Sequence, residues 1–289
     1  MILVVDSGST KTDWIAVDDS GKVLFSTQTL GLNPQVLSSE ILKERIVNNF
    51  ELYQNKDYVT NLYFYGAGCG VESPQLRIRK VFEEIFTNCA IIIKEDTYAA
   101  VYATSKPNEK SIVCILGTGS NCTYFDGKEI DQRVNSLGYV LMDEASGNFF
   151  GKQLIRSYYF NTMPKELALE FEKEYDLSPD TIKENLYRKE NPNAYLATFS
   201  RFLIKNKDNS LFQEIINNGL DRFINHQILQ FDDAKEVPIH FIGSISFFLE
   251  DEIKSALSAK GLSMGRIVKR PIEELVNFHK KLIEKGSQV

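Results

Sequence analysis

One local pattern occurs twice in this sequence: an apolar segment, a turn of glycine and hydroxyl residues, and a second apolar segment. The first copy spans residues 2–17 around the turn Asp6–Thr12, and the second spans residues 112–125 around Gly117–Asn121. Backbone N–H groups and short hydroxyls in such a turn can surround a phosphate, and a carboxylate such as Asp6 can face the accompanying metal. Ordinary hairpin turns use the same residue types, so the first turn alone fits a phosphate loop and a plain hairpin equally well. The repetition indicates a duplicated fold with one such turn in each half.

Length and composition place the chain among ordinary globular proteins. Its 289 residues are enough for two domains of usual size. With 43% hydrophobic and 25% charged residues, long disordered stretches are not expected. A net charge of −6 argues against nucleic acid or an anionic membrane as the main partner, because both attract basic surfaces. The start of the chain lacks a signal-peptide pattern, and no window reaches the ~18 apolar residues of a membrane span, so we expect a cytoplasmic protein.

Cysteine and histidine give little support for a metal centre or a histidine-based catalytic triad. The three histidines are widely scattered, and the four cysteines occur singly, without a CxxC pair. In a cytoplasmic protein such cysteines are expected to be buried free thiols. They are Cys69, Cys89, Cys114 and Cys122.

The first hundred residues alternate between strand and helix patterns. A polar turn at 18–22 separates two strands of a meander, and the glycine-rich segment 66–70 ends a buried strand. We expect strands at 2–6, 12–18, 23–28, 61–65 and 90–93, and helices at 38–50, 73–87 and from 96 onward. This order predicts one α/β domain.

The pattern restarts after residues 105–110, a polar segment with a proline that we expect to be a linker. Residues 144–235 are largely helical in pattern and are interrupted by three prolines. Further strands are expected at 112–116, 122–125, 238–242 and 263–268, and helices at 246–259 and 271–284. We therefore expect an N-terminal domain at 1–106, joined by the C-terminal helix at 271–289, and a C-terminal domain at 107–270 with a helical insertion.

Other nucleotide-binding motifs are absent from the sequence. There is no GxxxxGK(S/T) phosphate loop, and the segment Gly66–Gly70 lacks the GxGxxG spacing of a dinucleotide site. The loop signatures of protein kinases are missing as well. Two glycine/hydroxyl turns, one in each domain, could instead clamp the β- and γ-phosphates of a nucleotide, because phosphoryl transfer depends mainly on positioning and charge neutralisation.

Five segments in a fixed order carry a resemblance to a known superfamily. They are Asp6–Thr12, Glu95–Ala100, Leu116–Asn121, Leu137–Gly147 and Phe241–Ser244. In this order they resemble the motifs of the sugar kinase/actin/heat-shock ATPase superfamily. Over nearly its whole length the chain is similar to BadF/BadG/BcrA/BcrD-type ATPases and N-acetylglucosamine kinases. The resemblance implies an α/β fold of two ribonuclease H-like (actin-like ATPase) domains with a nucleotide cleft between them.

The resemblance also implies which residues bind ATP and Mg²⁺. Asp6 resembles the metal-facing carboxylate, which acts on Mg²⁺ through water. Lys11 would neutralise phosphate charge, although a solvent-facing lysine after a turn is the simpler alternative. The residues implied to contact ATP or its phosphates are Ser7, Gly8, Ser9, Thr10, Lys11, Gly117, Thr118, Gly119, Ser120, Gly243 and Ser244.

Asp96 resembles the general base, which takes the proton of the sugar hydroxyl as that hydroxyl attacks the γ-phosphate. An aspartate at the start of a helix can also serve simply as an N-cap. Asn33 resembles an asparagine that hydrogen-bonds the sugar, although a turn asparagine before a proline explains it nearly as well. Glu144 could likewise be a first-turn helix charge. The residues implied to bind the sugar are Asn33, Gly68, Asp96, Asn121, Asp143 and Glu144.

The sequence departs from the family pattern at several positions. Glu95 replaces an asparagine, and its like charge should raise the pKa of Asp96. Met142 and Ala145 replace glycines and are expected to stiffen or crowd the sugar side of the site. The pair Glu274-Leu275 stands where the family has small residues against adenosine. These departures leave the identity of the substrate open, and to a lesser degree the activity itself.

Together these assignments predict an ATP-dependent sugar kinase that phosphorylates N-acetylglucosamine or a related amino sugar at the 6-hydroxyl. Its partners would be a small-molecule amino sugar and ATP, with no nucleic acid and no membrane, and the sequence leaves a homodimer open. Two alternatives keep the fold: an ATPase that activates a partner enzyme through an iron–sulfur cluster, and a non-catalytic sugar-binding protein. The only cysteine pair in one domain, Cys69 and Cys89, does not lie in segments that resemble those of the cluster-binding activators.

Overall fold

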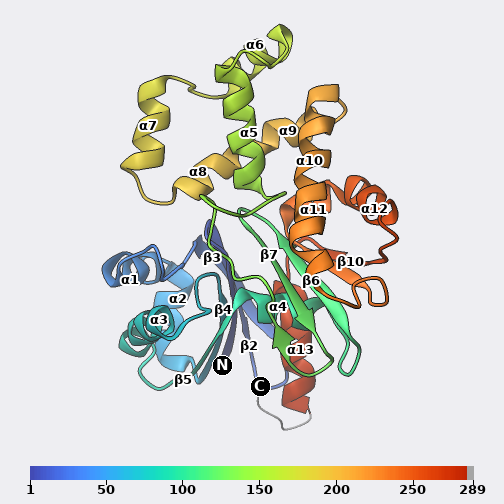
Figure 1. Ribbon diagram of the computed structural model, residues 1–289. Helices are drawn as coiled ribbons and strands as arrows, with labels where there is room; N and C mark the ends of the chain where they lie inside the picture. Colours follow the sequence, from blue (N-terminus) through green and yellow to red (C-terminus); the bar gives the residue numbers. More distant parts are fainter. Residues whose placement is uncertain (285–289) are drawn as a thin grey trace. The chain divides into compact units, whose positions relative to one another are not determined.

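The computed structural model describes residues 1–284 and divides the chain into two compact units. Unit 1 consists of Met1–Thr104 and Arg270–Val289, and unit 2 of Ser105–Lys269. Figure 1 follows the chain through both units in sequence colours. The final residues of the expected 271–289 helix, 285–289, lie outside the described part. The expected domain boundaries, 1–106 and 107–270, remain a prediction.

Unit 1 is built on a five-stranded sheet with the order β3-β2-β1-β4-β5. The strand β1 pairs antiparallel with β2 and parallel with β4, which in turn pairs parallel with β5. The first three strands form the expected meander because turns of small and polar residues connect them. The strands are β1 (Ile2–Ser7), β2 (Lys11–Val17), β3 (Val23–Leu30), β4 (Asn61–Gly66) and β5 (Ala90–Glu95).

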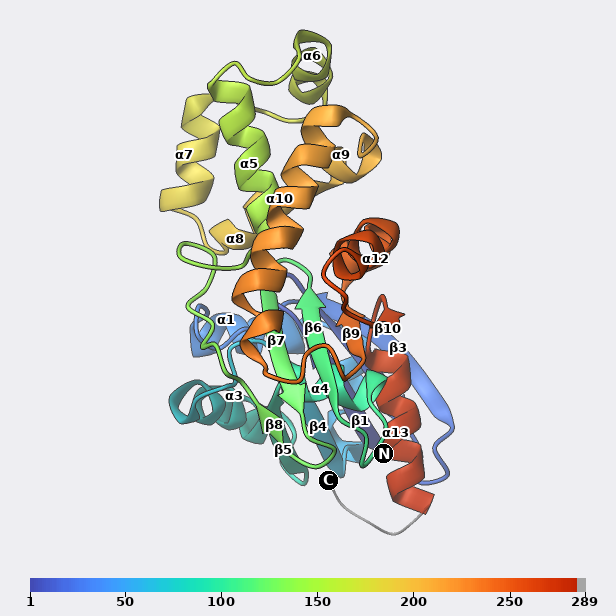
Figure 2. The ribbon, with the colours of Figure 1, turned by 45° about the vertical axis from the view of Figure 1, so that its right-hand side comes forward.

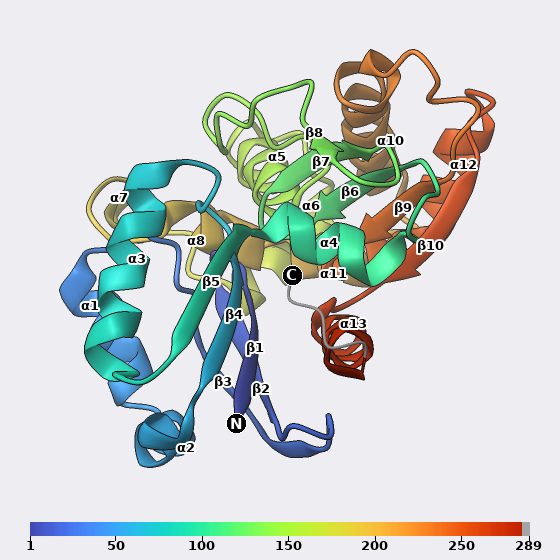
Figure 3. The same cartoon turned by 90° about the horizontal axis from the view of Figure 1, so that it is seen from below.

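Helices cover both faces of this sheet, as Figure 3 shows. Because successive side chains of a strand point to opposite faces, β1 serves two cores. Leu3 and Val5 pack with residues of α1, α2 and α3, whereas Ile2 and Val4 pack with residues of α4 and α13. These helices are α1 (Ser39–Val47), α2 (Phe50–Asn55), α3 (Glu72–Ile85), α4 (Asp96–Thr104) and α13 (Ile272–Glu284), and a 3-10 turn, η1 (Lys56–Tyr58), follows α2.

Unit 2 repeats the topology of unit 1. Its sheet has the order β10-β9-β6-β7-β8, in which β6 takes the place of β1 and β7 that of β2. The duplication expected from the two glycine/hydroxyl turns is thus confirmed in the pairing of the strands: β6 is antiparallel to β7 and parallel to β9. The strands are β6 (Ser111–Leu116), β7 (Ser120–Phe125), β8 (Ile130–Asp131), β9 (Ile239–Ile242) and β10 (Met264–Val268), with helices α11 (Ser244–Phe248) and α12 (Glu250–Ser258).

The expected helical insertion of unit 2 lies between β8 and β9. Phenylalanine is the most frequent residue in its core. The helices α5 and α10 run close together because Gly219 of α10 leaves room for the Phe149 ring (Figure 2). Pro179 and Pro192 begin α7 and α8, where a missing N–H costs nothing. The helices are α5 (Gly147–Tyr159), α6 (Lys165–Glu174), α7 (Pro179–Tyr187), α8 (Pro192–Thr198), α9 (Ser200–Lys205) and α10 (Ser210–His226), followed by the 3-10 turn η2 (Ile228–Gln230).

Two expected helices are each divided in the structure. The helix expected at 38–50 ends at Val47, and α2 begins after Asn49, whose Oδ1 accepts a hydrogen bond from the Leu52 N–H at 3.1 Å. Asparagine is a favoured N-cap because its side-chain oxygen accepts a hydrogen bond from an N–H of the first turn, which has no acceptor within the helix. The helix expected at 246–259 is likewise broken into α11 and α12 at Leu249. The short strand β8 was not expected, because two residues carry no alternation pattern.

No helix in the described part of the chain has the length and apolar character needed to cross a membrane. All four cysteines are free thiols, as expected, and all are buried except Cys89, which is half-buried. The expectation that Leu275 lies against adenosine is wrong, because its side chain is fully buried in the core of unit 1 beside Val4 and Tyr65. A leucine fits there because it belongs to the apolar face of α13.

An aromatic cluster attaches α13 to the rest of unit 1. The Tyr65 hydroxyl on β4 lies 2.9 Å from the His279 Nε2 of α13, and both residues are buried. The rings of Phe278 and Tyr102 stack with centroids 4.3 Å apart, which joins α13 to α4. Burial lowers the pKa of His279 to about 4, so this imidazole is neutral near pH 7.

The hydrogen bond between Tyr65 and His279 should contribute measurably to the stability of unit 1. We expect Tyr65→Phe to lower the free energy of unfolding by about 1–3 kcal/mol, because it leaves the buried His279 Nε2 without its partner. Urea unfolding followed by tryptophan fluorescence measures unit 1, since the single tryptophan, Trp14, is buried there. Tyr58→Phe is the matched control, because Tyr58 is 71% exposed. Equal losses in both variants would contradict the prediction.

Candidate functional site

In unit 1 the expected site residues gather at the carboxyl ends of the parallel strands. Ser7 of β1 is level with Gly66 of β4, and Gly66 is level with Glu95 of β5. Asp96 follows Glu95 directly and begins α4, as expected. Ligands of open α/β sheets bind at this edge, because the loops and helix starts converge there.

The first glycine/hydroxyl turn is held by a neighbouring segment of unit 1. The Gly8 N–H donates to the Lys11 carbonyl at 3.0 Å, which closes the turn. A Cβ on Gly31 would lie 2.3 Å from the Ser9 carbonyl oxygen, so only glycine permits this approach. The Ser7 hydroxyl is buried, lies 2.8 Å from the Thr12 hydroxyl and accepts a hydrogen bond from the Leu32 N–H. The Ser7 side chain therefore supports the turn from within the protein.

Lys11 does not extend freely into solvent. Its Nζ forms an ion pair of 2.7 Å with Asp13, a buried residue of β2 that also accepts a hydrogen bond from Gln28. Asp13 is directly opposite Asp6 in the antiparallel pairing of β1 and β2. Sequence reasoning missed Asp13, although its position across the hairpin from Asp6 was a usable signal. Its negative charge acts on Asp6, and the charge of Lys11 acts in the opposite sense.

Two carboxyl groups of this edge have strongly raised pKa values. Burial, followed by the charge of Asp13, raises the pKa of Asp6 to about 7. Burial, followed by the charges of Glu95 and Asp6, raises the pKa of Asp96 to about 8, although backbone hydrogen bonds at the start of α4 lower it in part. The effect expected from Glu95 is thus confirmed. Carboxyl groups with such pKa values can exchange a proton near neutral pH.

Asn33 lies close to the glycine loop that follows β4. Its Oδ1 accepts a hydrogen bond from the Gln35 N–H at 2.9 Å, so Asn33 does stabilise the turn that the sequence allowed at this position. Gly68 has φ +79°, and a Cβ there would lie 2.2 Å from the same Oδ1. No hydrogen bond to the Asn33 Nδ2 is found among residues 1–284, and the side chain is 9% exposed. The structure therefore brings Asn33 and Gly68 together and leaves an amide donor for a ligand.

In unit 2 the second turn carries the start of α5. The Gly117 N–H donates to the Gly119 carbonyl at 3.0 Å, which closes a tight turn between β6 and β7. The Gly117 carbonyl accepts the Gly147 N–H at 2.8 Å, and the Thr118 carbonyl accepts the Asn148 N–H at 2.9 Å. The first amides of α5 thus bind the carbonyl groups of the turn.

The Asp143 carboxylate lies over this turn. A Cβ on Gly119 would be 2.7 Å from its Oδ2, and the same oxygen accepts a hydrogen bond from the Asn148 Nδ2 at 2.9 Å. Burial raises the pKa of Asp143, while hydrogen bonds from Asn148 and the Ser120 backbone lower it in part. Sequence reasoning missed Asn148, because its role depends on the first turn of α5 folding back toward Asp143.

Glu144 is fixed by an arginine from the far end of the insertion. Its Oε1 forms a 2.6 Å ion pair with Arg222 of α10, and its buried Oε2 has no hydrogen-bond partner within residues 1–284. The Oδ1 of Asn148 is also buried and unpartnered. Such acceptors indicate a donor that the protein does not supply, such as a ligand hydroxyl or a water molecule. Both oxygens adjoin the segment that carries Asp143.

The backbone around this segment is left-handed at two non-glycine residues. Asp143 has φ 69° and Ala145 has φ 57°. The replacement of glycine by Ala145 therefore keeps a conformation that glycine would adopt with less strain. Asn121, the remaining residue expected near the sugar, is on β7, and its Oδ1 accepts the following N–H of Cys122 at 2.7 Å.

Gly243 connects β9 to α11 directly beside the second turn. Its φ is +117°, and a Cβ there would lie 2.2 Å from the Leu116 carbonyl oxygen. The next residue, Ser244, is exposed. The structure therefore brings Gly243 and the turn Gly117–Ser120 together within unit 2, as the resemblance implies for an ATP site.

Comparison with solved structures identifies the family. A candidate N-acetylglucosamine kinase from Porphyromonas gingivalis is 36% identical in sequence, with a TM-score of 0.87, over 97% of this chain and 99% of that one. The chain belongs to the N-acetylglucosamine kinase family. The resemblance seen in the five sequence motifs is thereby confirmed, and with it membership among the sugar kinases. No protein-family model matches the chain.

More distant structures share the fold. A candidate N-acetylglucosamine kinase from Chromobacterium violaceum has a TM-score of 0.70 at 14% identity, over 96% of this chain and 98% of that one. A ROK-family glucokinase from Streptomyces griseus, solved with glucose and AMPPNP, has a TM-score of 0.56 at 14% identity, over 98% of this chain and 100% of that one. The expected two-part actin-like α/β fold is confirmed.

The same substitution should destabilise unit 2 at Gly243 and have much less effect at Gly117. We expect Gly243→Ala to destabilise unit 2 by about 2–4 kcal/mol, because the added Cβ meets the Leu116 carbonyl at a left-handed φ. Gly117→Ala is the matched control, since no atom lies within 4 Å of a Cβ built there. Thermal unfolding followed by circular dichroism measures both. Equal stability of the two variants would refute this account of Gly243.

The raised pKa of Asp96 predicts a pH-dependent effect on stability. The folded pKa of about 8 exceeds the ordinary aspartate value of 3.8, so the folded state holds a proton that the unfolded state releases, and stability falls as pH rises between these values. We expect Asp96→Asn to raise Tm relative to the parent by a few degrees at pH 9 and by less at pH 5. Asp19→Asn, on an exposed turn, should show no such trend. A pH-independent difference in Tm would refute the prediction.

Proposed function

We propose that this chain transfers the γ-phosphoryl group of ATP to a hydroxyl of an amino sugar, with the 6-hydroxyl of N-acetylglucosamine as the first acceptor to test. The observation that carries the proposal is the carboxyl group of Asp96, with its raised pKa, at the carboxyl edge of the first sheet. Membership in the N-acetylglucosamine kinase family supports it.

Asp96 is proposed as the general base. A sugar hydroxyl is a weak nucleophile, and a carboxylate that accepts its proton during attack on the γ-phosphate lowers the barrier. A base works best when its pKa lies near the working pH, and burial together with the charges of Glu95 and Asp6 brings the pKa of Asp96 to about 8. The departure from the family pattern at Glu95 is therefore compatible with activity.

Asp6 is proposed to hold Mg²⁺ through water. No cluster of three or more acidic, histidine or cysteine side chains suited to a metal exists among residues 1–284. That fits Mg²⁺, which is usually bound by one or two carboxylates together with substrate phosphates and water. Asp6 has the required oxygens, and a cation beside it would relieve its repulsion with Asp13 and Asp96. When bound, Mg²⁺ neutralises charge on the transferring phosphoryl group.

The two glycine/hydroxyl turns are proposed to bind the phosphates of ATP. In each turn the side available to a ligand presents backbone N–H groups and short hydroxyls, which stabilise negative charge without reorganisation. The assignment covers the backbone of Ser7 and Gly8–Lys11 in unit 1, and Gly117–Ser120 in unit 2. Gly243 and Ser244, adjacent to the second turn, are proposed to contact the adenosine part of ATP.

The sugar is proposed to bind Asn33, Gly68 and Asp96 of unit 1 and Asn121, Asp143 and Glu144 of unit 2. The unpartnered Glu144 Oε2 supports this assignment, because sugar hydroxyls are the donors that a buried carboxylate oxygen needs. Asn148 joins the set, since its Oδ1 has the same need. The Asn33 Nδ2 offers a donor to a sugar oxygen. The cytoplasmic location, like the homodimer, remains a prediction.

The direct test measures ADP release by the purified full-length chain with ATP, Mg²⁺ and a panel of amino sugars and muramyl sugars. We expect turnover with N-acetylglucosamine or a close relative, and a 6-phosphorylated product by mass spectrometry and NMR. Absence of turnover with every member of the panel would overturn the proposal. Tight sugar binding without turnover would favour the non-catalytic alternative.

Asp96→Asn should separate chemistry from binding. We expect its turnover to fall by about 10²–10⁴-fold, the usual contribution of a positioned base, while the sugar Kd changes little. Isothermal titration measures the Kd, and the coupled ADP assay measures kcat. Asp19→Asn is the control for the loss of a surface charge. Unchanged turnover in Asp96→Asn would leave Asp96 as a helix cap only.

No observation favours an ATPase that activates a partner through an iron–sulfur cluster. Cluster ligands must be thiolates, and burial raises the pKa of Cys69 to about 12. Cys89, the other cysteine of unit 1, also has a raised pKa, about 11, for the same reason. Neither cysteine lies in a segment that resembles the cluster-binding segments of the activators, which is what weighs against this alternative.

A further inference from the structure

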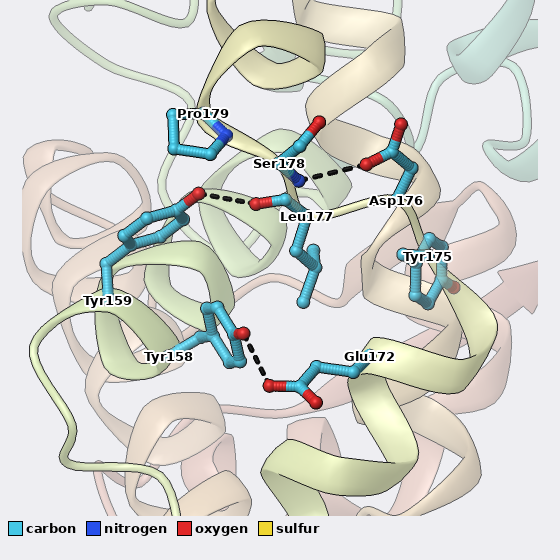
Figure 4. Close-up of a pocket in the computed structure, with 8 residues that line it drawn as sticks. All are labelled: Tyr158, Tyr159, Glu172, Tyr175, Asp176, Leu177, Ser178 and Pro179. Atoms are coloured by element: carbon cyan, nitrogen blue, oxygen red, sulfur yellow. Dashed lines mark hydrogen bonds between the residues drawn. The ribbon is translucent and has the colours of Figure 1, made fainter.

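The helical insertion of unit 2 contains a pocket that the proposed kinase site does not use. Its volume is about 500 Å³, within the range of small-molecule sites. The end of α5, the helix α6 and the segment that leads to α7 line it, and Figure 4 shows Leu177 pointing into the ring formed by the other side chains. The residues that matter here are Tyr158, Tyr159, Glu172, Tyr175, Asp176 and Leu177.

The hydroxyl groups around this pocket donate their protons to the protein itself. Tyr158 donates to the Glu172 Oε1 at 2.6 Å, and Tyr159 donates to the Leu177 carbonyl (Figure 4). Tyr175 donates to the carbonyl of Thr198 at 3.2 Å. The three phenol groups therefore present lone pairs and ring faces to a ligand, and no free hydroxyl proton.

Two carboxylates add negative charge to these acceptors. Asp176 accepts hydrogen bonds from the Ser178 N–H at 2.9 Å and from the Thr181 hydroxyl at 2.6 Å. These bonds hold the pKa of Asp176 below its usual range, so it is ionised at neutral pH. The second oxygen of Glu172 remains available beside Tyr158. Among residues 1–284, no lysine or arginine lines the pocket.

Two basic residues outside the lining also act on this pocket. Arg201 and Lys205 act electrostatically on Tyr175, but Lys205 is already paired with Glu174. Asp176 also acts on the hydroxyl of Tyr195, which is buried without a hydrogen-bond partner. The pocket is therefore rich in acceptors and in aromatic faces, and its own lining is negative.

We propose that this pocket binds an alkylammonium group. Such a cation is attracted to the faces of tyrosine rings and to carboxylates together, whereas an anionic ligand would be repelled by the carboxylates and would need donors that these hydroxyls have already used. The group could belong to a free quaternary amine or to a lysine side chain, and both present the same chemistry. The pocket shares no residue with the proposed kinase site.

A pair of isosteric probes tests the charge requirement. Choline and 3,3-dimethylbutan-1-ol have the same shape, but only choline is charged. We expect the full-length protein to bind choline with a Kd on the order of 1–10 mM, weakened by added NaCl, and to bind the alcohol at least about fivefold more weakly. NMR of ring-labelled tyrosine locates the site through shifts of the pocket tyrosines. Competition with Nα-acetyl-lysine amide distinguishes a free quaternary amine from a lysine side chain. The ammonium compound that binds more tightly indicates which of the two the pocket prefers.

Variants of the lining identify the groups responsible. Glu172→Gln should weaken choline binding by about two- to fivefold, because exposed cation contacts have that magnitude. Tyr175→Leu should weaken it similarly through loss of a ring face. Glu190→Gln, an exposed residue of the same insertion, is the matched control for loss of one negative charge. Kinase turnover should be unchanged in all three.

Three results would overturn the proposal: equal binding of choline and its neutral isostere, no saturable binding of either ammonium up to about 50 mM, or equal effects of Glu172→Gln and Glu190→Gln. None of them depends on kinase activity. Far-ultraviolet circular dichroism confirms that each variant is folded, and since Glu172 is exposed on a helix surface, its substitution leaves the core intact.

Discussion

Electrostatic repulsion at the carboxyl edge of the first sheet is a cost that the packing of unit 1 must offset. The in-register pairing of β1, β4 and β5 places Asp6, Glu95 and Asp96 at the same edge, where the charges of Glu95 and Asp6 oppose ionisation of Asp96. Packing elsewhere must offset the cost of holding these groups together. The buried face formed by β1, β4, α4 and α13 supplies that packing, and the cluster around Tyr65 joins its parts. The proposed reactivity therefore rests on a helix contributed by the end of the chain.

The sequence predicted most elements of both sheets and the start of α4 at Asp96, because those features follow from local patterns of apolar residues and caps. It did not predict Asp13, Asn148 or Arg222, whose roles depend on a partner across a hairpin, on the fold-back of a helix start, and on a distant helix. It placed Leu275 wrongly because a family pattern was applied where the apolar face of α13 decides the contact. Local signals thus give the elements, and the contacts between elements give the chemistry.

The two glycine/hydroxyl turns share a topology and differ in how they are held. In unit 1 the Ser7 hydroxyl and the close approach of Gly31 secure the turn. In unit 2 the first amides of α5 and the Asp143 carboxylate secure it. Strand order is repeated between the units, while the supporting interactions are not. Each half therefore supplies a different chemical surface from the same backbone plan.

The attachment of α5 to the second turn has a consequence for how such a chain can change over time. Gly147 and Asn148 donate their backbone amides to the turn, so the root of the insertion is part of the framework that holds the second glycine/hydroxyl turn. The outer helices of the insertion, α6 and α7, do not contribute to these hydrogen bonds. Lineages descended from a common ancestor could lengthen, shorten or redecorate those outer helices without disturbing the turn. The base of the insertion is therefore constrained by its hydrogen bonds to the turn. Its tip, where the tyrosine-lined pocket lies, can vary in sequence and length.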